Sequence, residues 1–202
     1  IESFPMRNQR GVFPVVLFSF LLSVHLTQAQ PGQDAGIGKM TDIHGIVHEP
    51  SKSQKTVAVV FIYVDITCPI ANFYQPLLRR LAKTYEPKGI RFYQIHPDPD
   101  GEPSALVTHA KEYEVVSPVI LDSKQALAEK HTAKVTPEAH VYLPDGSRIY
   151  RGRIDNTYAT YGKRRPEATS HELRDALQAA VAGRRPATAV TEAVGCQILI
   201  ER

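Results

Sequence analysis

An uncharged apolar stretch from Val57 to Val64 ends in a short polar turn that leads to Cys68 and Pro69. The stretch is rich in β-branched residues, which is typical of a central strand buried on both faces. Pro69 suits the first turn of a helix, because the N–H that it lacks has no partner there. Cys68 is therefore predicted at a helix N-terminus, where free amides and the helix dipole favour a thiolate.

The length and charge of the chain limit what it can be. Its 202 residues allow one domain plus extensions, and a net charge of +3 with scattered basic residues does not indicate a nucleic-acid partner. The chain has two cysteines, Cys68 and Cys196, so it is not a disulfide-framework protein.

Residues 1–29 are interpreted as upstream residues and a secretory signal peptide. Arg7 and Arg10 precede an apolar run over residues 11–26, and a small-residue cleavage site lies near Ala29. We favour cleavage over an uncleaved anchor, which would be the only contact with a membrane. The mature protein is expected to be extracytoplasmic, either periplasmic or secreted, where disulfides persist.

The rest of the chain predicts one α/β domain over residues 39–183. A flexible lead-in over residues 30–38 precedes it, and a tail over residues 184–202 carries Cys196. Strands and helices alternate along the domain, after an expected β-hairpin at residues 40–48. This order predicts a central mixed β-sheet flanked by helices, with the hairpin as an N-terminal extension.

Local patterns also predict where the helices begin. Ser104 and Ser123 are expected to start helices, and Thr169 with Glu172 forms a capping-box pattern for a last helix. Pro76 is expected to kink the helix after Cys68 without ending it.

Several of these features resemble the thioredoxin fold. The resemblance is carried by the strand–Cys68–helix unit, by Pro76, and by Val135-Thr136-Pro137 at the start of a terminal ββα unit. In that family the residue matching Pro137 is a cis-proline beside the active-site cysteine. The lead hairpin and the insertion over residues 104–121 make the chain more similar to redoxins, the AhpC/TSA group and its TlpA-like relatives.

Three short motifs resemble exported bacterial redoxin-like proteins with a single-cysteine CPxA motif. They are Thr67 to Tyr74, Tyr150 to Asp155, and Gly195-Cys196. The resemblance implies that Cys68, Thr67, Thr136 and Pro137 are catalytic residues, with Cys196 as a candidate resolving thiol.

The chain also departs from the better-known branches of that superfamily. Ala71 stands where a thioredoxin has its second cysteine, and Ile62 stands where it has a buried acid. Asp65 stands where a peroxiredoxin has a threonine before its peroxidatic cysteine. These departures disfavour ordinary peroxidase chemistry.

Each candidate residue has a plainer interpretation. Cys68 could be an inert core cysteine, and Pro137 a trans-proline at the start of a strand. We favour a reactive Cys68 and a cis Pro137. The tail after Gly183 is expected to lie over the surface, and whether Cys196 pairs with Cys68 stays open at this point.

The histidines and the basic loop give weaker signals. His44 and His48 have metal-like spacing only in a helix, and Gly45 argues against a helix. His96 is more typical of a surface histidine than of a metal ligand. The run Lys163 to Arg165 is more typical of a solvated loop than of an anion site.

Two functions are compatible with these patterns, besides a non-catalytic thiol-binding module. In the first, Cys68 attacks a protein or small-molecule disulfide or an oxidised thiol, and Cys196 or an external thiol reductant releases the product. In the second, Cys68 holds Cu(I) together with a histidine such as His96. No organic cofactor and no nucleic-acid partner is predicted. A metal belongs only to the second function.

Overall fold

The computed structural model describes residues 1–2 and 37–200 of the chain. The expected signal segment, its cleavage site near Ala29 and most of the lead-in lie outside the described residues. No helix in the described part of the chain is long and apolar enough to span a bilayer.

A five-stranded mixed sheet forms the centre of the fold, in the order β5-β4-β3-β7-β8. Its strands are β3 (Ala58–Tyr63), β4 (Ile90–His96), β5 (Val119–Leu121), β7 (Glu138–Tyr142) and β8 (Arg148–Gly152). Strand β3 is parallel to β4 and antiparallel to β7, and all its residues are buried. The predicted mixed sheet, with the apolar stretch as its central strand, is confirmed.

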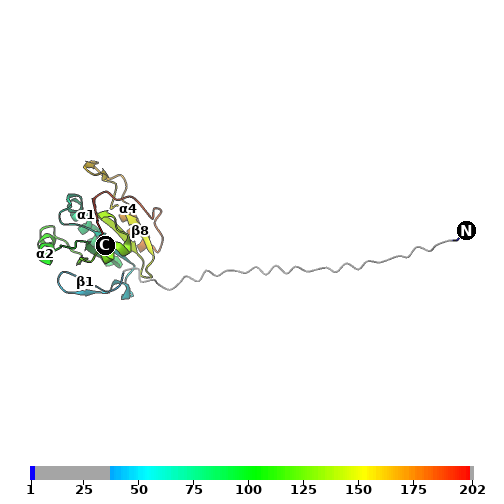
Figure 1. Cartoon of the computed structure of the whole chain (residues 1–202), viewed down its shortest axis with the longest axis horizontal. Coiled ribbons are helices and arrows are strands. Elements are labelled where there is room, and N and C mark those ends of the chain that lie inside the picture. Colours follow the sequence, from blue (N-terminus) through cyan, green and yellow to red (C-terminus); the bar gives the residue numbers. More distant parts are fainter. Residues whose placement is uncertain (3–36, 201–202) are drawn as a thin grey trace. The chain divides into compact units, whose positions relative to one another are not determined.

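In the described part of the chain, the sheet is accompanied by the α-helices α1 (Pro69–Tyr85), α2 (Pro103–Glu112), α3 (Ala126–His131) and α4 (Glu172–Val181), and Figure 1 labels α1, α2 and α4. Alternate residues of β3 point to opposite faces of the sheet. Val60 and Ile62 share one core cluster with α1 and α4, whereas Phe61 and Tyr63 share another with Ala128 of α3. This two-sided burial explains why β3 has no charged residue.

Helix α1 begins where its sequence predicts. Cys68 is the N-cap residue, with extended backbone angles, and Pro69 opens the first turn. Pro76 lies inside the helix, which continues to Tyr85. A short 3-10 turn over residues 86–88 follows, and Gly89 takes a left-handed conformation with φ of +88° before β4.

Short strand pairs lie outside the central sheet. The predicted hairpin is formed by β1 (Met40–Thr41) and β2 (Val47–His48). A second hairpin, β9 (Tyr158–Thr160) with β10 (Lys163–Arg164), was not predicted and includes the basic run. Strand β6 (Val135–Thr136) pairs with β11 (Cys196–Gln197), so the C-terminal tail takes part in strand pairing besides covering the surface.

Two of the predicted helix starts are wrong. Helix α2 begins at Pro103 after the N-cap residue Glu102, because the proline already supplies the backbone conformation of a first turn and Ser104 falls inside the helix. Helix α3 begins after Gln125 instead of at Ser123. Its first amides, of Leu127 and Ala128, donate to the carboxylate of Asp122.

The predicted capping box of α4 is also wrong. The N-cap residue is His171, so Glu172 is the first helical residue. The amide of Thr169 donates to the side-chain oxygen of Asn156 at 2.8 Å, and the Asn156 amide donates to the Thr169 hydroxyl at 2.7 Å. Asn156 therefore binds the amide and the hydroxyl of Thr169, which a capping box would have used.

Candidate active site

Cys68 lies at the junction of β3 and α1 and is completely buried. The turn before it is held by the carboxylate of Asp65, which accepts hydrogen bonds from the amide and the hydroxyl of Thr67 at 2.7 and 2.8 Å. The amide of Cys68 donates to the Asp65 carbonyl at 3.1 Å. Thr67 thus helps to shape the turn, and its exposed hydroxyl is engaged by Asp65.

The segment before β7 packs against the sulfur of Cys68. The Thr136–Pro137 peptide bond is cis, and the carbonyl oxygen of Thr136 accepts a hydrogen bond from the Cys68 thiol at 3.0 Å. Cys68, Thr136 and Pro137 are therefore neighbours, although 68 residues separate Cys68 from Thr136.

The second cysteine of the chain lies at the same place. Strand β11 runs antiparallel to β6, with Cys196 opposite Thr136. The Cys196 thiol donates to the sulfur of Cys68 at 2.9 Å, across 128 residues of sequence. Both cysteines are free thiols.

The two thiols have opposite pKa shifts. Burial raises the pKa of Cys68, but hydrogen bonds from the Cys196 thiol and from the backbone amides of Ala71 and Cys196 outweigh it and hold this pKa below its usual value. Burial, the hydrogen bond to Cys68 and the charge of a Cys68 thiolate raise the pKa of Cys196 to about 12. Cys68 is therefore the thiol that ionises first.

Known structures resemble the fold of this chain. An uncharacterized conserved protein from Geobacillus kaustophilus is 26% identical, with a TM-score of 0.68 over 80% of this chain and 87% of that one. A hypothetical protein from Sinorhizobium meliloti is 22% identical, with a TM-score of 0.69 over 79% and 88%. A secreted disulfide oxidoreductase of Mycobacterium tuberculosis, described as homologous to E. coli DsbE, is 16% identical, with a TM-score of 0.52 over 75% and 99%.

The chain has a thioredoxin-like fold. No family model and no curated protein sequence matches it. The structural likeness therefore identifies the architecture of the chain and not the chemistry of its site, which depends on the residues around Cys68.

Within the thioredoxin-like fold, two residues that received no role from the sequence brace the first turn of α1. The side-chain amide of Asn72 donates to the carbonyl of Ile66 at 2.9 Å, which ties the helix to the turn before Cys68. The Asn72 oxygen lies 2.8 Å from Nε2 of His109 in α2. The nearness of Asn72 to Cys68 in the sequence was a usable signal. Nothing local indicated His109.

Glu138, which directly follows Pro137, fixes β6 from inside the fold. It is buried, and its carboxylate accepts hydrogen bonds from the amides of Lys134 at 2.7 Å and Val135 at 3.4 Å. Nε2 of His140 lies 3.3 Å from the same carboxylate. Burial raises the pKa of Glu138, but His140 and the two amides outweigh it, so the pKa is lowered and the carboxylate stays charged.

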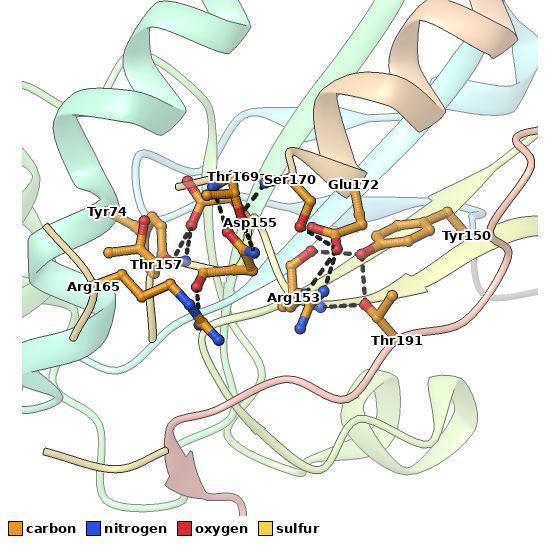
Figure 2. A network of polar contacts seen from close by, with 11 residues as sticks. Tyr74, Tyr150, Arg153, Asp155, Thr157, Arg165, Thr169, Ser170, Glu172 and Thr191 are labelled. Atoms are coloured by element: carbon orange, nitrogen blue, oxygen red, sulfur yellow. Dashed lines mark hydrogen bonds and ion pairs between the residues drawn. The ribbon is translucent and has the colours of Figure 1, made fainter. Parts of the chain in front are cut away.

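The Tyr150–Asp155 motif connects the sheet to α1, α4 and the tail (Figure 2). Arg153 binds the carboxylate of Glu172 in α4, with its Nε 3.0 Å from Oε1, and Asp155 accepts a hydrogen bond from Tyr74 in α1 at 2.6 Å. The hydroxyl of Tyr150 lies 2.8 Å from the hydroxyl of Thr191, which also accepts from the amide of Arg153 at 3.0 Å. The motif thus serves as a docking surface for the tail.

The surface interpretation of His96 is wrong, because its side chain is 2% exposed. Burial and the neighbouring His109 lower the pKa of His96 to about 3, so its ring is neutral at physiological pH. His48 binds the carboxylate of Asp42 at 2.7 Å. No group of three or more His, Cys, Asp or Glu side chains within residues 1–2 and 37–200 is arranged to hold a metal ion.

Proposed function

We propose that this protein is a thiol–disulfide oxidoreductase in which Cys68 is the attacking thiol and Cys196 resolves the mixed disulfide. The observation that supports this proposal most directly is the 2.9 Å separation of the Cys68 and Cys196 sulfurs at the N-terminus of α1. Ala71 occupies the place where a helix residue could have supplied a second thiol, and Cys196 supplies one from the tail instead. The opposite pKa shifts support Cys68 as the thiol that attacks first.

The reaction follows the usual course of thiol–disulfide exchange. The Cys68 thiolate attacks one sulfur of a substrate disulfide, a Cys68–substrate disulfide forms, and the other substrate sulfur leaves as a thiolate that takes up a proton. The negative charge on Cys68 is then gone, and with it the charge and the hydrogen bond that raised the pKa of Cys196. Cys196 then loses its proton more easily and attacks the Cys68 sulfur, which releases the substrate as a thiol.

The product of this cycle is a Cys68–Cys196 disulfide, which an external thiol reductant opens again. Forming that bond requires the sulfurs to approach from 2.9 Å to about 2.05 Å, a small movement of the tail. The substrate class is therefore a disulfide or an oxidised thiol on a protein or a small molecule. The predicted signal segment supports an extracytoplasmic site of action, and the similar fold from M. tuberculosis is described as secreted.

Peptide mapping of the protein after oxidation and after reduction tests this proposal. A Cys68–Cys196 crosslink is expected in the oxidised protein. Cys196→Ser is expected to accumulate a mixed disulfide on Cys68 when treated with hydroxyethyl disulfide, and Cys68→Ser is expected to form neither product. Equal consumption of the disulfide by Cys68→Ser and the unmodified chain would refute the role of Cys68.

The copper alternative is tested in the same samples. A neutral, buried His96 is chemically suited to Cu(I), as is a thiolate. Stoichiometric Cu(I) binding that His96→Ala abolishes, together with no disulfide exchange at Cys68, would favour metal handling over the oxidoreductase.

A further inference from the structure

The tail of this chain occupies a site shaped for an extended polypeptide. Strand β11 pairs with β6 at Cys196–Thr136 and at Gln197–Val135, and the amide of Ile198 continues the pairing by donating to the carbonyl of Lys134 at 2.9 Å. Among the described strands, β6 has no partner other than β11. An exposed strand edge of this kind recognises peptides through their backbone, and side-chain contacts supply selectivity.

Resting on the proposed function, we propose that the β6 edge selects extended polypeptide substrates with a glycine directly before the reactive cysteine, and that the tail is its internal occupant. A Cβ added at Gly195 would collide with the carbonyl oxygen of Thr136 and would lie 2.5 Å from its carbonyl carbon and 3.1 Å from the nitrogen of Pro137. These are backbone atoms, which cannot rotate aside as a flexible side chain does. Any polypeptide bound in the same register meets the same limit.

The two positions after the cysteine differ in which side chains they select. The side chain of Gln197 is exposed, so this position selects no residue type. Ile198 is half-buried and packs against the core cluster that contains Phe61 and Tyr63. The tail therefore represents a substrate pattern of glycine, cysteine, any residue and an apolar residue.

The tail is held in a way that permits exchange. Thr191 is bound by the hydroxyl of Tyr150 and the amide of Arg153, and Gly152 leaves room for the backbone of Thr191 (Figure 2). Two large apolar side chains of the tail stay in solvent, with Val190 59% and Leu199 75% exposed. Strand pairing and polar contacts thus hold the tail together with the partly buried side chains of Val194, Ile198 and Ile200, which pack against the core clusters.

Occupancy by the tail and by a substrate is mutually exclusive at β6. A substrate first displaces residues 195–198 and forms its disulfide with Cys68. The tail then returns to β6, displaces the substrate backbone and brings Cys196 to the Cys68 sulfur, which releases the substrate thiol. The glycine before Cys196 is what allows the same site to accept the tail and the substrate in turn.

The test uses the full chain in a Cys196→Ser background, so that mixed disulfides on Cys68 are not resolved. The probes are the disulfide-linked dimers of two peptides, Ala-Val-Gly-Cys-Gln-Ile and its analogue with alanine before the cysteine. The rate of Cys68–peptide disulfide formation is followed by intact mass spectrometry at a pH above the alkylation midpoint of Cys68 in both variants, because release of the tail also removes the donor at position 196 that lowers the pKa of Cys68. Added Gly195→Ala is expected to release the tail. Added Gly162→Ala is the control for a glycine-to-alanine change: a Cβ there meets no atom within 4 Å, and the strain of an alanine at φ of +75° falls on the β9–β10 hairpin instead of on the β6 edge.

Release of the tail by Gly195→Ala is expected to raise the rate with the glycine peptide about tenfold over the Gly162→Ala control, and the glycine peptide is expected to react about tenfold faster than the alanine peptide. Equal rates for the two peptides would overturn the selectivity, and equal rates for the two variants would overturn the occupancy by the tail. Hydroxyethyl disulfide separates these failures from a failure of the proposed function. If Cys68 exchanges with neither this small disulfide nor the peptides, the oxidoreductase itself is refuted.

Discussion

Replacing Cys196 by alanine should raise the pKa of Cys68, because it removes the thiol that donates to the Cys68 sulfur at 2.9 Å. A hydrogen bond to a charged group contributes about 1.5–3 kcal/mol. Since Cys196 is partly exposed, the lower end applies, and about 1.5 kcal/mol corresponds to a rise of about one pKa unit. Cys196→Ser keeps a hydroxyl donor at the same place and should shift the pKa by less than about half a unit.

The pH dependence of iodoacetamide alkylation of Cys68 measures this shift, with peptide mapping to assign the label. The midpoint of Cys196→Ala is expected at a higher pH than the midpoints of the unmodified chain and of Cys196→Ser, which both keep a donor at position 196. Loss of the Cys196 side chain also admits water, and less burial by itself would lower the pKa of Cys68. A midpoint in Cys196→Ala at or below that of the unmodified chain would show that burial dominates, and would refute the hydrogen-bond explanation.

Other substitutions test the supports of the site. Glu138→Gln removes a buried carboxylate whose pKa is lowered in the folded protein, so its charged form stabilises the fold above about pH 4.3 and less as the pH falls further. The variant should therefore lose about 2 kcal/mol of unfolding free energy at pH 7 in urea and little at pH 3. An equal loss at both pH values would contradict this. Gly152→Ala places a methyl group against Thr191 and should slow Cys68–Cys196 crosslinking; because the φ of Gly152 is +144°, it should also lower the melting temperature, and unchanged crosslinking would show that the tail docks without Thr191. Leu177→Ala, at a fully buried site in α4, should cost about 2–5 kcal/mol of unfolding free energy, and a loss below 1 kcal/mol would contradict the observed packing.

The central part of the fold was predictable because its signals are local. An uncharged apolar run identifies β3 as a strand covered on both faces, and Cys68-Pro69 marks the start of α1 without reference to any distant residue. The starts of α2 and α3 were predicted wrongly because a neighbouring residue, Pro103 or Asp122, determines the first turn. The predicted capping box failed because groups outside its segment competed for the same hydrogen bonds. The capping box of Thr169 and Glu172 gave way to Asn156 and Arg153, which arrive from the far end of β8.

The sequence by itself determined the strand, the helix and the nucleophile candidate, together with the absence of a second cysteine at Ala71. The tertiary structure alone decided what surrounds the sulfur of Cys68. Cys196 reaches it because β11 pairs with β6, and no local pattern specifies a contact across 128 residues. The need for glycine at position 195 is evident only from the tertiary structure, in which the carbonyl of Thr136 lies where a Cβ would be. A glycine in a sequence does not reveal which backbone it must approach.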